Sequence, residues 1–100
     1  MVSYKDVVED LKKNPKINIL QTFRGAEAIK KYKSFHPEAD VARFSAEERK
    51  NSFFLVLRRK LRVHYEFLVK YYIGSGDDLL VWGEAYKEGQ WDTVRKDHGL

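Results

Sequence analysis

Four cations lie close together in one stretch of this chain, and their spacing is typical of a surface that contacts phosphate. Arg58, Arg59, Arg62 and Lys70 belong to residues 53–73, which carry five basic residues and one acidic residue. Guanidinium and ammonium groups neutralise the phosphates of a nucleic-acid backbone, and they suit an acidic protein surface equally well. We therefore expect these cations to bind an anionic partner, which is an acidic protein surface or, as the alternative, a nucleic acid.

A second basic group precedes this stretch, and two aromatic residues could complete a binding surface. Lys30, Lys31 and Lys33 would extend the patch if the fold brings them to the same side. Tyr72 and Trp91 could stack on exposed bases, as aromatic side chains do in proteins that bind single strands. The competing interpretation is a solvated basic surface above an aromatic core.

The sequence offers few residues that could support catalysis. A small enzyme would use His64 and a carboxylate as general acid and base, but no paired nucleophile and base is visible in the sequence. The absence of cysteine excludes disulfides and thiolate metal sites. The three histidines match no recognised metal spacing, so we expect neither a metal nor a cofactor.

Length, composition and charge indicate one small binding domain. One hundred residues with 43% hydrophobic and 14% aromatic content can build a single core, so we treat 1–100 as one domain. Residues 74–100 carry three basic and six acidic residues, so this segment could cover the basic stripe instead of leaving it to a partner. The N-terminus shows no secretory signal, which predicts an intracellular protein of the cytoplasm or nucleus, without a membrane partner.

The element expected to carry the cations is a long helix over residues 45–73. Ser45 and Glu48 form a capping box, in which each side chain accepts a hydrogen bond from the other residue's backbone N–H. Projected at 100° per residue, one face is apolar and the opposite face basic. The apolar face comprises Phe53, Leu57, Leu61, His64, Tyr65, Leu68 and Tyr72.

A strand interpretation competes for the same stretch. From Leu61 to Ile73 every second residue is apolar, which is the period of a half-buried strand. This interpretation leads to an α+β fold with strands near 16–24, 53–73 and 79–86.

The remaining elements complete a mainly α architecture. Periodicity predicts helices over 3–13, 26–35, 77–88 and 90–98, with a turn at 74–78 between the central helix and the last two. The expected fold is therefore a single small domain of short helices packed around one long central helix. So broad an apolar helix is hard for short neighbours to cover, which makes a homodimer plausible.

Overall fold

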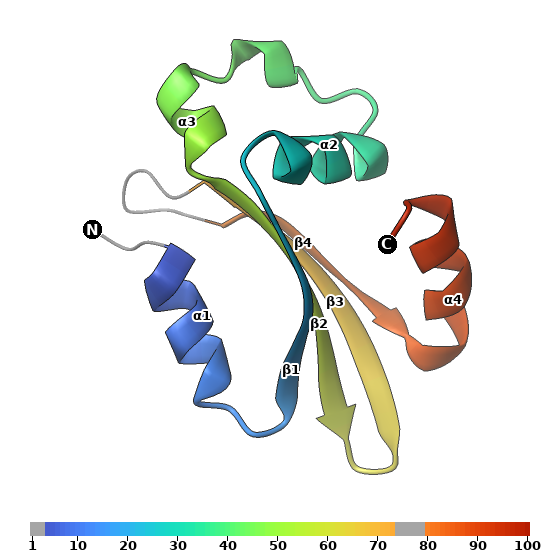
Figure 1. Ribbon diagram of the computed structural model, residues 1–100. Helices are drawn as coiled ribbons and strands as arrows, with labels where there is room; N and C mark the ends of the chain where they lie inside the picture. Colours follow the sequence, from blue (N-terminus) through green and yellow to red (C-terminus); the bar gives the residue numbers. More distant parts are fainter. Residues whose placement is uncertain (1–3, 74–79) are drawn as a thin grey trace.

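The computed structural model describes residues 4–73 and 80–100. The chain folds into helices and one group of strands in an α+β arrangement (Figure 1). In order they are α1 (Tyr4–Lys12), β1 (Ile17–Arg24), α2 (Ala26–Phe35), the 3-10 turn η1 (Val41–Arg43), α3 (Ala46–Lys50), β2 (Ser52–Leu61), β3 (His64–Ile73), β4 (Leu80–Lys87) and α4 (Glu88–Asp97).

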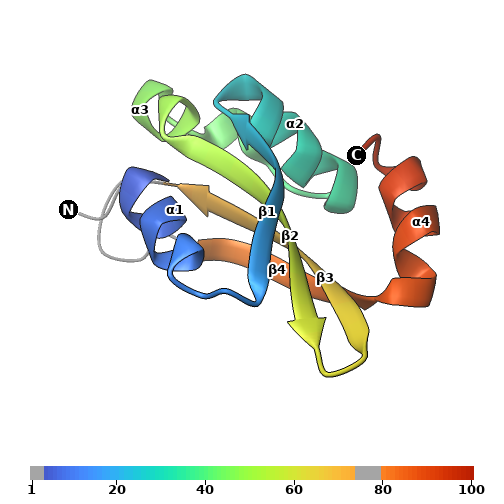
Figure 2. The same cartoon turned by 60° about the horizontal axis from the view of Figure 1, so that its bottom comes forward.

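The strands form one antiparallel sheet in the order β1-β2-β3-β4, so each strand pairs with the next along the chain. Helix α1 packs on one face of this sheet, and α2 and α4 pack on the other (Figures 1 and 2). Strands β2 and β3 are therefore central and have protein on both sides, whereas β1 and β4 are the edges.

The predicted long helix is wrong, and with it the mainly α fold class. Its start is confirmed, because the Ser45 side chain accepts from the Glu48 backbone N–H and Glu48 accepts in return from Ser45. The helix ends at Lys50, however, and the chain continues as two strands joined by a turn. The α+β alternative placed strands in the same three regions that β1, the β2–β3 pair and β4 occupy.

Burial on both sheet faces explains why the periodicity misled. Phe53, Leu55 and Leu57 point toward α1, while Phe54 and Val56 point toward α2. A central strand covered on both faces is apolar at nearly every position. Such a run fills a wide arc on a helical projection as readily as it fills two faces of a sheet, so periodicity alone cannot separate the two.

A bulge at Leu20 allows the edge strand β1 to place side chains both in the layer with α1 and in the layer with α2. Before it, Ile19 lies opposite Leu57 and faces α1; after it, Gln21 lies opposite Val56 and faces α2. One extra residue reverses the face of every following side chain. Alternate burial therefore continues along β1 although the packing partner changes from α1 to α2.

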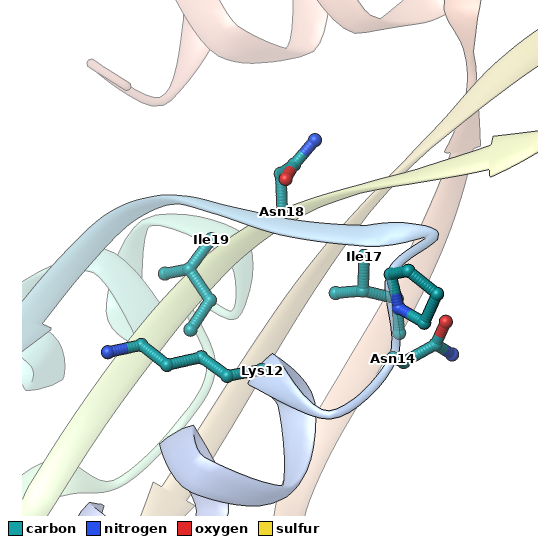
Figure 3. A pocket seen from close by; sticks show the side chains of 6 residues that line it. Lys12, Asn14, Ile17, Asn18 and Ile19 are labelled. Carbon is teal, nitrogen blue, oxygen red and sulfur yellow. The ribbon is translucent and has the colours of Figure 1, made fainter.

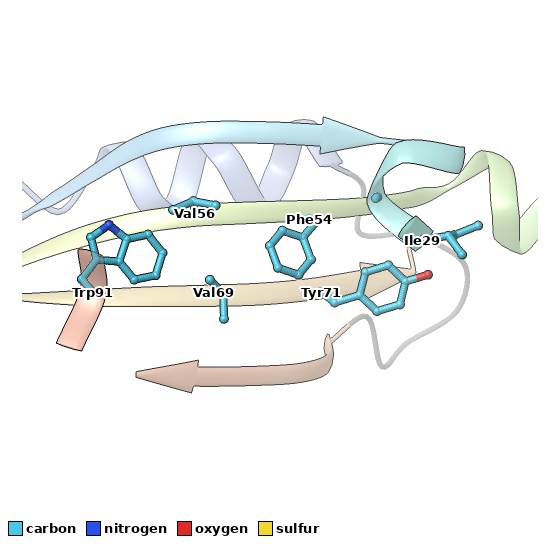
Figure 4. Packing of buried hydrophobic residues seen from close by; sticks show 7 residues of the cluster. Ile29, Phe54, Val56, Val69, Tyr71 and Trp91 are labelled. Atoms are coloured by element: carbon cyan, nitrogen blue, oxygen red, sulfur yellow. The ribbon is translucent and has the colours of Figure 1, made fainter. Parts of the chain in front are cut away.

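The larger core lies between the sheet and helices α2 and α4 (Figure 4). Phe54 and Val69 contribute from the central strands and Trp91 from α4, and all three are buried. Tyr71 is buried there too, with its hydroxyl 2.8 Å from the Ser52 hydroxyl, and burial raises the pKa of Tyr71. This layer fixes the positions of α2 and α4 on the sheet.

The other expectations had mixed outcomes. The helices predicted over 3–13 and 26–35 are confirmed as α1 and α2. The helix predicted over 77–88 is wrong where described, because 80–87 is an edge strand, and α4 begins directly after it. The turn predicted at 74–78 lies outside the described residues. Among the helices that are described, none combines the length and apolar content needed to cross a bilayer.

The turn between β2 and β3 is strained at Arg62, whose φ is +36°. Glycine adopts positive φ without a steric penalty, so we expect Arg62→Gly to keep the stability unchanged or raise it by up to about 1 kcal/mol in urea denaturation. The control is Lys60→Gly in the extended strand, which should lower stability by about 0.5–1 kcal/mol. Equal losses at both positions would contradict a strained turn.

Candidate anion-binding site

The end of the β2–β3 hairpin projects beyond its neighbouring strands. Strand β1 pairs with β2 only as far as Arg59, and β4 pairs with β3 only as far as Glu66. Among the strands that the structure describes, none other lies beside residues 61–65, and Figure 1 shows them at the end of the sheet. We call residues 58–66 the basic hairpin.

Unpaired cations surround this projection. Arg58, Lys60 and Arg62 come from the hairpin itself, and within the described residues none of them has a carboxylate within 4.0 Å. Lys16 joins them, because its carbonyl accepts a hydrogen bond of 2.8 Å from the Lys60 backbone N–H. Four positive charges thus lie around one end of the sheet.

Arg59 differs from these cations although it is adjacent to two of them in sequence. Its side chain lies on the α1 face, where it forms an ion pair with Glu66, its cross-strand partner on β3. Arg58 and Lys60 lie on the opposite face, because successive strand residues alternate. The hairpin therefore presents its free charge mainly on the α2–α4 side and at the turn.

The structure adds Tyr65 to the site, a residue that sequence reasoning had placed in an apolar helix face. The guanidinium of Arg58 lies 4.6 Å from the centroid of the Tyr65 ring. The two residues occupy diagonal positions on neighbouring strands, within reach of an arginine. The alternation from Leu61 to Ile73 was the signal that could have placed Tyr65 on a strand.

The other predicted cations lie away from the hairpin end. Lys70 is on the α1 face beside Gly83 and, six residues along β3 from His64, roughly 20 Å from the turn at the usual strand rise. In α2, the ammonium groups of Lys31 and Lys33 donate to the carbonyls of Gly99 and Ala39. Lys30 is exposed on α2.

Both predicted stacking aromatics are core residues. Tyr72 is 7% exposed and stacks on Phe53 at a centroid distance of 4.8 Å, and burial raises the pKa of its hydroxyl. Trp91 is also 7% exposed and stacks on Phe67 at 5.0 Å. The homodimer was expected because the apolar residues of 53–73 would have formed a helix face too broad for its neighbours to cover. In the structure these residues pack against other residues of the same chain, so that argument for a homodimer does not hold.

His64 is exposed at the start of β3, on the α1 face with Glu66. In a strand these two residues share a face, whereas in a helix they would diverge. The Glu66 carboxylate is already engaged by Arg59. Over residues 4–73 and 80–100, no three His, Asp or Glu side chains gather closely enough to hold a metal ion.

A pocket of about 340 Å³ lies at the base of the hairpin, beside the loop between α1 and β1 (Figure 3). Ile17 and Ile19 supply apolar lining, and Lys12 and Asn14 supply polar groups. Asn14 Oδ1 accepts from the Lys16 backbone N–H at 3.0 Å, which shapes the loop. Lys16, one of the four cations of the site, thus lies in the chain between two residues that line the pocket, Pro15 and Ile17.

Among the described residues of the acidic C-terminal segment, no carboxylate lies within 4.0 Å of a cation of the hairpin. Asp92 in α4 pairs with Arg95 and Lys96 of the same helix, at 2.8 and 3.1 Å. Hydrogen bonds from Arg95, then from Lys96, lower the pKa of Asp92. Asp92 is therefore ion-paired within α4.

Comparison with models of protein families, with curated proteins and with solved structures finds no match for this chain. The geometry of the basic hairpin is accordingly the basis for its functional assignment.

Proposed function

We propose that this protein binds nucleic acid and that the basic hairpin contacts its phosphates. The observation that carries the proposal is a group of four cations around a projecting strand pair, none of which forms an ion pair within the described residues: Lys16, Arg58, Lys60 and Arg62. Each cation that neutralises a phosphate releases a condensed counterion, which favours association. The overall charge of +4 is modest, so the attraction depends on this local concentration.

The shape of the hairpin supports the same function. It is a two-stranded antiparallel ribbon whose end extends beyond the pairing with β1 and β4, as far as residues 4–73 and 80–100 show. Such a ribbon reaches a nucleic-acid surface without a clash from the rest of the domain, and its alternating side chains present charge on both sides and at the turn.

The test is a fluorescence-anisotropy titration with single-stranded DNA, duplex DNA and RNA over a range of salt concentrations. Four phosphate contacts predict a slope of log K against log salt of about −3 to −4. The absence of binding to all three nucleic acids at low salt would refute the proposal.

An acidic protein surface is the second candidate partner, and one observation favours it. Val63 at the turn is 84% exposed and Leu61 is 42% exposed, so the cations surround apolar side chains that phosphates do not need. Apolar contacts respond weakly to salt. A partner of this kind would therefore show a shallower slope than a nucleic acid.

A further inference from the structure

We infer that the basic hairpin takes single-stranded rather than duplex nucleic acid, with an unpaired base stacking on Arg58 and Tyr65. The inference rests on the proposed function and adds a base contact to its phosphate contacts. It starts from Tyr65, the one tyrosine of the hairpin, whose ring centroid has the Arg58 guanidinium 4.6 Å away.

The pair offers two planar groups of the kinds that bind bases. Tyrosine rings and guanidinium planes both stack on unpaired bases, because every base has a π face and the guanidinium adds a cation–π attraction. The contact between Arg58 and Tyr65 orders both side chains before a ligand arrives. A base stacked on this pair therefore extends an arrangement that is already present.

The residues opposite Arg58 on the two neighbouring strands define where a base could bind. On the β1 side its partner is Asn18, which is exposed and makes no side-chain hydrogen bond within the described residues. Figure 3 shows the Asn18 amide on the opposite side of β1 from Ile17 and Ile19. An amide at this position can pair with the edge of a stacked base.

On the β3 side, the partner of Arg58 is Phe67, which stacks on Trp91 of α4. Helix α4 thus closes one side of the platform, whereas the β1 side has an exposed amide. Figure 1 shows α2 at the other end of the sheet from the hairpin turn, so this end of β2 is not covered by α2.

Two further cations lie beside the stacking pair, on the side of the hairpin turn. Lys60 is the cross-strand partner of Tyr65, and Arg62 lies at the adjacent turn. A strand whose base stacks on Tyr65 would place its flanking phosphates near these charges. A duplex cannot make the same contact, because its bases are already stacked and paired inside the helix.

The test compares three probes of equal length by fluorescence anisotropy at low salt: a single-stranded oligonucleotide, the same strand with abasic sites in place of its bases, and the duplex. The abasic strand keeps the phosphates and lacks the bases. We expect the intact strand to bind about tenfold more tightly than the abasic strand and the duplex.

Variants separate stacking from charge. Tyr65→Ala should remove most of the tenfold preference and leave the affinity for the abasic strand unchanged, and Tyr65→Phe should retain the preference. Arg58→Lys keeps the charge and loses the plane, so it should reduce the preference alone. Arg62→Ala should weaken binding to the intact and abasic strands by the same factor.

The outcomes distinguish failure of the inference from failure of the proposed function. Equal binding of intact and abasic strands, or an equal loss for both on Tyr65→Ala, overturns the inference and leaves phosphate binding in place. Lack of binding to every probe overturns both. Circular dichroism of each variant verifies that the sheet is retained.

Discussion

Replacing Arg58, Lys60 and Arg62 together by alanine is expected to lower the affinity for nucleic acid by a factor of about 100 to 1000 at about 0.1 M salt. Three lost phosphate contacts reduce the slope of log K against log salt by about 2 to 3. If the affinity extrapolated to 1 M salt is unchanged, each unit of slope corresponds to about a factor of ten at 0.1 M. Anisotropy titrations at several salt concentrations measure both quantities.

The matched control removes the same charge elsewhere. Lys5, Lys30 and Lys50 are exposed on α1, α2 and α3, away from the hairpin. Their joint replacement by alanine should change the affinity only slightly, because screening limits the reach of an exposed charge to about 10 Å at this salt. An equal loss in the control would show that net charge matters and that the hairpin does not.

Arg59 is omitted from the triple variant because it already has a carboxylate partner. Its ion pair with Glu66 lies partly buried on the α1 face. Removing Arg59 would leave the negative charge of Glu66 uncompensated beside the remaining cations. A loss of binding in that variant would therefore combine a direct and an indirect effect.

Phe54→Ala is expected to cause the largest loss of stability. Phe54 is 0% exposed and packs between Phe23 and Phe35, with ring centroids at 6.4 and 5.8 Å. Truncating a buried phenylalanine to alanine costs about 3–5 kcal/mol through lost burial and the cavity left behind. Since small domains have about 5–15 kcal/mol in total, this change should lower Tm by at least about 12 °C.

Leu20→Ala is the control for this substitution. Leu20 is a bulge residue of β1 and is 42% exposed, so its truncation should cost less than about 1 kcal/mol. Urea denaturation followed by circular dichroism measures both changes. Comparable losses at the two positions would contradict the placement of Phe54 in the core between the sheet and α2.

Local signals predicted the elements that depend on local physics. The capping box at Ser45 is present because a hydroxyl and a carboxylate three residues apart satisfy backbone N–H groups wherever the chain goes next. The helix over 26–35 was found from its periodicity, and Pro37 follows its end. These interactions join residues within about one helical turn of each other.

The site was only partly accessible from sequence, because its geometry depends on the type of element. On a helix, Arg58 and Arg59 would lie 100° apart on one basic side, whereas in β2 they lie on opposite faces. The structure thus separates a free arginine from an ion-paired one. It also brings Tyr65, seven residues along the chain, beside Arg58.

The sequence by itself determined a single chain with enough apolar residues for a core, a capped start near Ser45 and a concentration of positive charge over residues 53–73. Only the tertiary structure decided that this stretch is two strands and which of its cations remain free. The physical reason is burial from both sides. Because helices cover both faces of the sheet, β2 is apolar at every position from 53 to 57, and a run that is apolar throughout does not specify its own period.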